Sequence, residues 1–158
     1  MKILPRIALL FVIAITLAAC ATSGGRRISE PAASIQQLTV DAQGNWNIRL
    51  RLQNYSSVAM TFDRVALELS VSETTAVRLD AAPALTIGPE SADVTSIAVT
   101  PDASARLQIA DALASGRSVR YQLKGRLTAT PDAGRARDFD ITRNSALSPA
   151  PGLPGVLR

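Results

Sequence analysis

Asp138 and Asp140 are the two side chains whose type and spacing come closest to a catalytic or metal-binding arrangement. Residues i and i+2 of a strand share a face, so the two carboxylates could form an acid–base pair or contribute to a calcium site. Calcium, however, takes roughly six to eight oxygens from a dense acidic loop, and no Asp-x-Asp-x-Asp-Gly segment occurs. Arg137 and Arg143 flank the pair. We therefore interpret Asp138 and Asp140 as part of the outward polar face of an edge strand.

The absence of histidine narrows the possible chemistry further. The chain has 158 residues, no His and one Cys. These counts exclude a Ser-His-Asp or Cys-His catalytic arrangement, a zinc site of the Cys₂His₂ or Cys₄ type and an intramolecular disulfide. We predict no catalytic, cofactor-binding or metal-binding residue, and therefore a protein that is not an enzyme and needs no cofactor.

The single cysteine, Cys20, lies at the end of an N-terminal leader. Lys2 and Arg6 flank its start, and residues 7–17 form a nearly unbroken apolar run. A positive start, an apolar stretch and small residues before a cleavage point are typical of a secretory signal peptide, and the run is too short for a membrane span of about 20 residues. Residues 17–20 (LAAC) match the lipobox of bacterial lipoproteins, in which the cysteine is diacylated. We predict that Cys20 is a lipid attachment site.

Acylation at Cys20 would anchor the protein to a membrane after removal of residues 1–19 as the signal peptide. One acyl chain binds a membrane only marginally, whereas two or more hold a protein stably. Ala21 stands where an Asp favours retention in the inner membrane of many Gram-negative bacteria. The predicted location is therefore the cell envelope, facing the periplasm, with the outer membrane favoured. Residues 20–33 are mostly small and polar and are predicted to form a flexible tether.

The charged residues carry no signature of nucleic-acid binding. Of the net charge of +4, two charges lie in the leader, and the remaining cations are interleaved with acidic residues. Six aromatic residues are too few to provide stacking platforms, so we predict no nucleic-acid partner. A basic sheet face remains possible if the strands that carry its members are neighbours, and it could bind anionic lipid or an acidic partner. Its members would be Arg49, Arg51, Arg120, Lys124 and Arg126.

Hydrophobic alternation after residue 34 predicts a series of short antiparallel strands. The clearest run places Trp46, Ile48, Leu50 and Leu52 on one face and charged or amide side chains on the other. Strict period two with a polar second face is typical of a half-buried strand. Segments of similar character, separated by turn residues, predict strands at 35–40, 46–53, 59–71, 77–79, 85–87, 94–100, 119–127 and 139–141.

Residues 104–115 depart from this pattern and predict a short helix. They are rich in Ala, Leu, Gln and Arg, and Gly116 is placed to end the helix. Asp102 or Ser104 could cap its start, and Leu107 is spaced to share a stripe with small apolar residues. Strands about ten residues apart indicate a β-sandwich or small barrel over residues 34–147, and the Pro- and Gly-rich residues 148–158 predict an irregular tail.

The order of these elements resembles the LEA14-like, or LEA type 2, domain, also called the WHy (water stress and hypersensitive response) domain. The resemblance covers residues 34–147 and rests on the strand end 49–54 (RLRLQN), the strand 61–71, and a helix before the strand 119–127. Asn54-Tyr55-Ser56 stands where the family has Asn-Pro-Asn. Asn54 suits the first position because it can form an Asx-turn.

The resemblance implies an all-β, immunoglobulin/fibronectin-III-like antiparallel β-sandwich of seven strands with one short helix. It also implies no enzymatic activity and an association with desiccation or other stress tolerance. The leading expectation is an accessory, lipid-anchored protein that acts by surface contact with membrane or envelope proteins. One alternative is an interaction module that docks on an envelope complex through a strand edge or the arginine-bearing face, and another is a lipid-handling sandwich with acyl chains between its sheets. The oligomeric state is left open.

Overall fold

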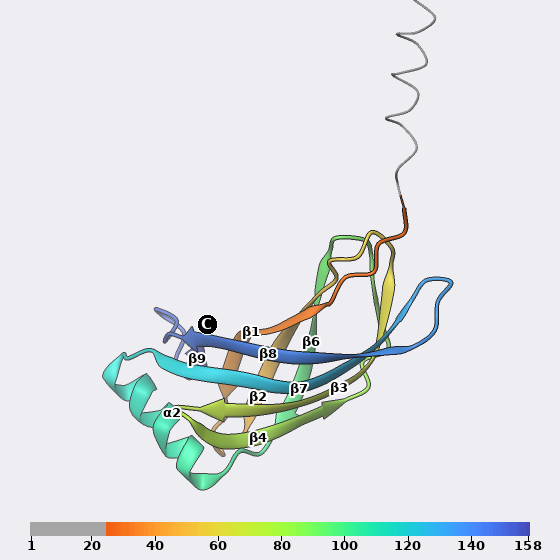
Figure 1. The fold of residues 1–158 in the computed structure, drawn as a ribbon. Helices are drawn as coiled ribbons and strands as arrows, with labels where there is room; N and C mark the ends of the chain where they lie inside the picture. The colour runs from red at the N-terminus through yellow and green to blue at the C-terminus, as the bar shows by residue number, and fades with distance from the viewer. Residues whose placement is uncertain (1–24) are drawn as a thin grey trace, which may run out of the picture.

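The computed structural model describes residues 25–158, in which two antiparallel β-sheets pack against each other and one helix crosses an end (Figure 1). The all-β prediction with one short helix is confirmed. The predicted signal peptide, residues 1–19, and Cys20 lie outside the described residues. No helix in residues 25–158 is long and apolar enough to cross a membrane.

The first sheet has four strands in the order β6-β2-β1-β9. Every neighbouring pair in this sheet is antiparallel, and β6 forms one free edge. A β-bulge in β1 shifts the register between Ile35 and Gln37. The strand bounds are β1 Ala32–Val40, β2 Trp46–Gln53, β6 Ala92–Val99 and β9 Val156–Leu157.

The second sheet has five strands, with the order β4-β3-β7-β8 and the short β5 paired with β3 beside β4. Its central pair, β3 and β7, forms a long ladder that runs from Met60↔Pro131 to Val71↔Tyr121. The strand bounds are β3 Met60–Val71, β4 Thr74–Ala81, β5 Leu85–Ile87, β7 Val119–Pro131 and β8 Arg137–Leu147.

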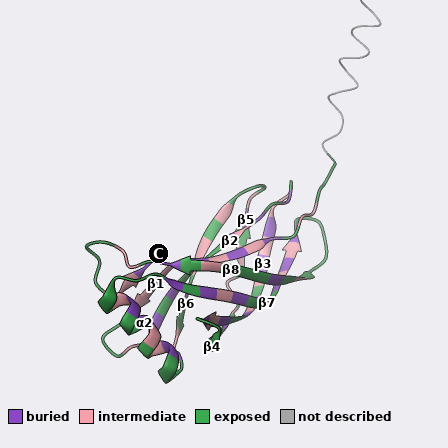
Figure 2. Ribbon diagram, turned by 60° about the vertical axis from the view of Figure 1, so that its left-hand side comes forward, coloured by how far each residue is buried: buried purple, intermediate pink, exposed green. Residues whose placement is uncertain are grey.

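The inward faces of the two sheets form one apolar core. In β2 the predicted inward side chains are fully buried, whereas Arg49 and Arg51 are exposed, and Figure 2 shows this alternation of buried and exposed residues along the strands. Burial of each large apolar side chain contributes about 1.5–3 kcal/mol. The largest fully buried side chains are Trp46, Phe62, Leu38, Ile48, Leu50, Leu52, Met60, Leu67, Leu69, Leu79, Ile109 and Leu123.

Gly125 allows β7 to approach β3 closely. Its φ is +149°, and a Cβ built there would overlap the backbone of Ala66 and Leu67 on β3. A residue with a side chain could occupy this position only if the two strands moved apart. The glycine therefore maintains the strand spacing at the centre of the five-stranded sheet.

The helix α2 (Ala103–Ser115) covers the end of the sandwich where β3 and β4 meet and β7 begins (Figure 1). Gly116 ends it in the left-handed conformation, as predicted, and the Asp102 N–H donates to the Ala76 carbonyl of β4 at 3.0 Å. Ala105, Ile109 and Ala112 are the buried helix residues. The expected apolar stripe through Leu107 is wrong, since this side chain is 72% exposed. Asp102 occupies the N-cap position but its carboxylate makes no capping hydrogen bond.

Several boundaries differ from the sequence-based expectations. The first strand begins at Ala32, inside the expected tether, and β8 runs far beyond the expected 139–141. The expected irregular tail contains β9, whose Leu157 pairs with Leu38 of β1 and is fully buried. Nine strands are therefore present in residues 25–158, two more than the resemblance implied.

Candidate contact site

The turn after β2 is organised by the side chain of Asn54. This residue is fully buried, and its Oδ1 accepts the Ser56 N–H at 2.8 Å in an Asx-turn. The two hydrogens of Nδ2 are directed at the carbonyl oxygens of Val58, Ile87 and Gly88, at 2.8, 3.1 and 2.9 Å. Asn54 thereby connects the β2–β3 turn to the end of β5. A buried amide group requires such partners, because an unsatisfied one costs about 1–3 kcal/mol.

Ser56 extends this network to the N-terminal segment. Its side chain is fully buried, and its Oγ accepts the Ser29 N–H at 2.9 Å. The hydroxyl hydrogen of Ser56 can point to the Ser29 carbonyl at 3.3 Å or to the Met60 sulfur at 3.2 Å. The Ser56 carbonyl accepts the Glu90 N–H at 3.1 Å. Ser56 therefore links the N-terminal segment, the β2–β3 turn and the β5–β6 loop.

Residues 26–29, which we call the N-terminal strap, are held on this end of the sandwich. Arg27 and Ser57 exchange two hydrogen bonds, from Arg27 N to Ser57 Oγ at 2.9 Å and from Ser57 N to the Arg27 carbonyl at 3.0 Å. The Arg27 guanidinium also contacts Glu90 at 2.9 Å and the Tyr55 carbonyl at 3.1 Å. Arg26 donates to the Asp132 carbonyl in the β7–β8 loop. The prediction of a flexible tether extending through residue 33 is therefore wrong for these four residues.

The strap determines where the chain leaves the sandwich. The described chain enters at the end formed by the β2–β3, β5–β6 and β7–β8 loops, opposite the end covered by α2 (Figure 1). Tyr55 lies on this loop end with half of its side chain exposed. The sequence carries no local signal for the strap, because its hydrogen-bond partners lie far away along the chain, in the β2–β3 turn and at Glu90 and Asp132.

The outer face of the five-stranded sheet pairs its cations with acidic residues. Arg64 and Asp80 form an ion pair at 2.9 Å, and the hydrogen bond from this guanidinium to Asp80 raises the pKa of Arg64. Glu68 lies between Arg78 on β4 and Lys124 on β7 in the strand register. Exposed pairs of this kind contribute about 0–1 kcal/mol each. The main effect of this pairing is to leave the face nearly neutral.

Asp138 and Asp140 belong to the same outer face. The Arg126 side chain lies 3.7 Å from Asp138 and 3.5 Å from Asp140, and Thr128 donates to Asp138 at 2.7 Å. Both carboxylates are exposed, so they are the outward polar face that we predicted. Within residues 25–158 no group of three or more His, Cys, Asp or Glu side chains is placed to hold a metal ion.

The outer face of the four-stranded sheet has a different charge. Arg49 and Arg51 project from β2, and their neighbours across the ladders are uncharged: Ser34, Gln37, Val94 and Ser96. Arg51 donates to Gln53 at 2.9 Å, and neither arginine forms an ion pair among the described residues. We call this surface the arginine face.

The condition for a continuous basic face, that the strands carrying its members are neighbours, is not met. Arg49 and Arg51 lie on β2, whereas Arg120, Lys124 and Arg126 lie on β7. These strands belong to different sheets whose inner faces share the core, so their outward side chains point in opposite directions. The arginine face therefore contains only the first two of the five expected cations.

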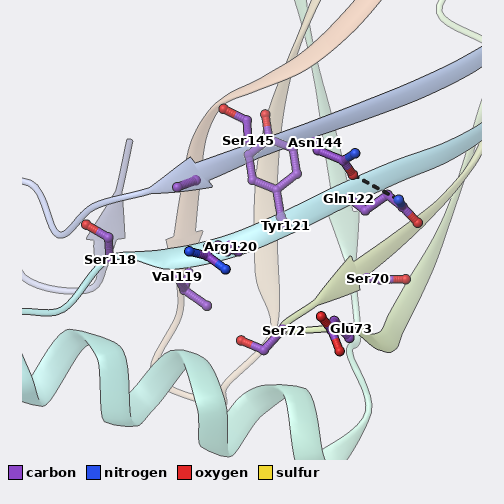
Figure 3. Close-up of a pocket in the computed structure, with 11 residues that line it drawn as sticks. Ser70, Ser72, Glu73, Ser118, Val119, Arg120, Tyr121, Gln122, Asn144 and Ser145 are labelled. Atoms are coloured by element: carbon purple, nitrogen blue, oxygen red, sulfur yellow. Dashed lines mark hydrogen bonds between the residues drawn. The ribbon is translucent and has the colours of Figure 1, made fainter.

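A shallow pocket of about 1050 Å³ lies over β3, β7 and β8 near α2 (Figure 3). Most of the residues that line it carry a hydroxyl or amide group, and Gln122 donates to Asn144 at 2.9 Å. The Tyr121 ring is buried, and its hydroxyl accepts the Ile35 N–H at 3.1 Å. An acyl chain requires an apolar cavity, so this polar pocket gives no support to the lipid-handling alternative.

Taken together, these features define a β-sandwich domain with a buried Asx-turn and two differently charged outer faces. A family model described as late embryogenesis abundant protein, LEA_2, matches residues 49–143, which is more than half of the chain. The chain therefore belongs to the LEA_2 family, and the predicted resemblance is confirmed. This family is related to stress and desiccation and is generally non-enzymatic.

Two solved structures illustrate the shared fold. The solution structure of AT1g01470 from Arabidopsis thaliana superposes with a TM-score of 0.53 and 13% identity, covering 82% of this chain and 89% of that chain. The solution structure of At2g46140.1, a candidate late embryogenesis abundant (LEA) protein, gives a TM-score of 0.50 and 13% identity, covering 98% and 87%. No curated protein has a significantly similar sequence. At this level of identity the similarity concerns the fold.

Proposed function

We propose that this protein is a lipid-anchored, non-enzymatic envelope protein that contributes to desiccation or stress tolerance by direct surface contact. The observation that carries the proposal is membership of the LEA_2 family over residues 49–143. The described surface is consistent with contact rather than catalysis, because its carboxylates are exposed and are paired with cations or hydroxyl groups. The proposed contacts are with membrane or with neighbouring envelope proteins as water is lost.

The proposed anchor is the acylated sulfur of Cys20, after cleavage of residues 1–19, with the outer membrane as the favoured location. The proposal rests on the lipobox sequence at residues 17–20. The position of the strap adds a geometric consequence. Because Arg26 and Arg27 are held on the loop end, only residues 21–25 separate Cys20 from the folded domain. The six extended residue steps from Cys20 to Arg26 would span at most about 22 Å, so the loop end would face the membrane at short range.

The proposed fold class is the immunoglobulin/fibronectin-III-like sandwich. Strands β1, β2 and β6 share one sheet, while β3, β7 and β8 share the other. This division corresponds to strands A, B, E and C, F, G of the immunoglobulin-type arrangement, with α2 in the connection that leads to β7. The strand order thus supports the proposed class independently of sequence.

The experiment that tests the proposed function combines labelling with survival. Cells that produce the wild-type protein or Cys20→Ala are grown with a fatty-acid analogue and then dried. We expect labelling of the wild-type protein alone, and improved survival of drying only in cells that carry it. Labelled Cys20→Ala protein would contradict the anchor, and equal survival of cells with and without the protein would contradict the stress role.

A second candidate function is docking on an envelope complex. It is favoured by one specific observation, the free edge of β6 beside the uncompensated arginines of β2.

A further inference from the structure

We propose that the edge of β6 binds an extended, acidic segment of a partner protein, which adds a strand to the four-stranded sheet and pairs its carboxylates with Arg49 and Arg51. The inference deepens the proposed function, and it rests on that function only in assuming that the domain acts by contact. It depends on two independent observations, the unprotected edge of β6 and the charge of the arginine face.

The edge of β6 has few of the features that usually prevent strand addition. Long edges are normally protected by charged side chains, Pro or bulges. The other long edges follow this rule, since β4 carries Arg78 and Asp80, and β8 carries four charged residues. In contrast, β6 has eight residues, many of them β-branched, and its only charged residue is Asp93 near its start. β4 approaches β6 at one corner of the sandwich but forms no ladder with it.

The register identifies the backbone groups that a partner strand would contact. Residues of an antiparallel pair alternate between those whose N–H and C=O point to the neighbour and those whose groups point away. Asn54 N–H donates to the Ser91 carbonyl at 2.8 Å, so the ladder with β2 directs the backbone groups of Val94, Ser96 and Ala98 toward the free edge. The Val94 N–H is indeed bonded to the adjacent Asp93 carboxylate at 2.7 Å rather than to a strand.

The arginines lie at the correct distance and on the correct face for such a partner. Arg51 is the register partner of Val94, and Arg49 that of Ser96, so all four side chains share the outer face. An added strand would lie about 10 Å from β2, two strand spacings away. The side chains between them belong to small residues, so an extended guanidinium can reach a carboxylate on the added strand. Two acidic residues at positions i and i+2 of the partner would face the two arginines.

The chemistry of the partner follows from the charge of this surface. No acidic side chain lies on the strand positions that share the arginine face, whereas the opposite outer face is compensated by Glu68, Asp80, Asp138 and Asp140. Strand addition provides backbone hydrogen bonds, and side chains that alternate along the added strand provide specificity. A basic partner segment would meet Arg49 and Arg51 with like charge, which disfavours binding. An acidic extended segment is complementary to both features.

A second copy of this chain fits the surface less well. If the β6 edges of two copies paired antiparallel, the copies would be related by a two-fold axis perpendicular to the sheet. The loop end that carries the N-terminal strap would then point in opposite directions in the two copies. Two copies anchored to one membrane through Cys20 could not adopt that arrangement. We therefore propose that the partner at this edge is a different protein.

The test measures binding of a fluorescent peptide to the full-length protein in nonionic detergent. The probe is a capped peptide with the sequence Thr-Glu-Val-Glu-Val-Glu-Thr, and the control peptides carry Gln or Lys in place of Glu. We expect the Glu peptide to bind about tenfold more tightly than the Gln peptide, and the Lys peptide not to bind. Arg49→Gln combined with Arg51→Gln should abolish the preference for Glu over Gln. The matched control, Arg78→Gln with Lys124→Gln, removes two exposed charges from the opposite face and should leave the preference intact.

Hydrogen exchange on the same samples locates the contact. The Glu peptide should slow amide exchange at Ser96 and Ala98 of β6, and Ser96→Pro, which removes an edge N–H but no ladder hydrogen bond, should weaken binding. The wild-type exchange result stands even if the proline variant folds poorly. Equal binding of the Glu and Gln peptides, binding that is unchanged in Arg49→Gln/Arg51→Gln, slowed exchange outside β6, or a dimer that protects β6 without peptide would each overturn the proposal. If the protein does not improve survival of drying but the Glu peptide binds β6 as expected, the stress role is rejected and the proposed contact surface stands.

Discussion

The side-chain hydroxyl of Ser56 accepts the backbone N–H of Ser29 at 2.9 Å, which ties the N-terminal strap to the β2–β3 turn. Ser56 is fully buried, so this bond is shielded from water. The pair joins the segment that leads to the predicted anchor with the turn that corresponds to the family's Asn-Pro-Asn motif. With the proposed anchor at Cys20, this small hydroxyl group would help to orient the domain relative to the membrane.

Replacing this hydroxyl should detach the strap. Ser56→Ala leaves the Ser29 N–H without its acceptor and should lower the free energy of unfolding by about 1–3 kcal/mol. Urea denaturation measures this change, and amide exchange at Ser29 should become faster. Ser57→Ala is the matched control, because its Oγ is exposed and water can replace it, so we expect a cost below about 1 kcal/mol. Equal costs for the two variants would mean that burial of Ser56 has no energetic consequence.

Asn54→Asp tests the amide group of the buried turn. The substitution keeps the Asx-turn acceptor for the Ser56 N–H but replaces the Nδ2 donors, so an oxygen would face the carbonyls of Val58, Ile87 and Gly88. We expect a loss of at least about 2 kcal/mol in the free energy of unfolding. The loss should shrink at acidic pH, where a protonated carboxyl can donate one hydrogen bond. A variant as stable as the wild type at pH 7 would contradict the assigned amide orientation.

Gly125→Ala tests the close approach of β7 to β3. A Cβ at this position would overlap the Ala66 backbone, and the φ of +149° is unfavourable for alanine. Overpacking and backbone strain together should cost about 2–4 kcal/mol, measured by thermal or urea unfolding. Gly116→Ala provides the control, since its Cβ would point into open space and only its φ of +65° is unfavourable. Its cost should be about 1 kcal/mol, so equal costs would contradict the steric account.

Asp41 gives a prediction about pH. Although burial opposes the change, hydrogen bonds from Asn45, Gln43 and Gly44 lower the pKa of this carboxyl below its ordinary value of 3.8. A carboxyl with a lowered folded pKa stabilises the folded state above its unfolded pKa and loses that contribution as the pH falls through the folded pKa. The β1–β2 turn should therefore loosen only below about pH 4. A carbon-detected NMR titration in which Asp41 titrates at or above 3.8 would contradict this network.

Sequence reasoning succeeded where the determining interactions are local. Arg49, Leu50 and Arg51 alternate with a period of two, and this period alone predicts that Leu50 points into the core. In the structure Leu50 is buried and both arginines are exposed. Gly116 likewise ends α2 because glycine adopts the left-handed conformation readily. Asn54 was recognised because an Asx-turn needs only the two residues that follow it.

The remaining features depend on long-range contacts. Hydrophobic periodicity shows which side chains of a strand point outward, but it does not show to which sheet the strand belongs. For this reason the sequence left open a single basic face made by the outward cations of β2 and β7, whereas these cations lie on the outer faces of different sheets. Residues 26–29 have the composition of a linker, and their docking depends on acceptors near residues 55–57 and 132. Val156–Leu157 is too short to show a pattern, and it becomes a strand only because β1 offers a free edge. Leu107 fits a helical stripe, but α2 packs on the sandwich through Ala105, Ile109 and Ala112.

The central claim is that the folded domain protects its neighbours by stoichiometric contact, and drying a labile enzyme with the purified protein tests this most directly. The enzyme is dried and rehydrated with increasing molar ratios of the full-length protein in detergent, or with an equal mass of an unrelated β-sandwich protein in the same detergent. We predict that recovered activity rises with the molar ratio, saturates once the enzyme surface is covered, and exceeds that of the control at every ratio. Recovery no better than with the unrelated sandwich would contradict the claim.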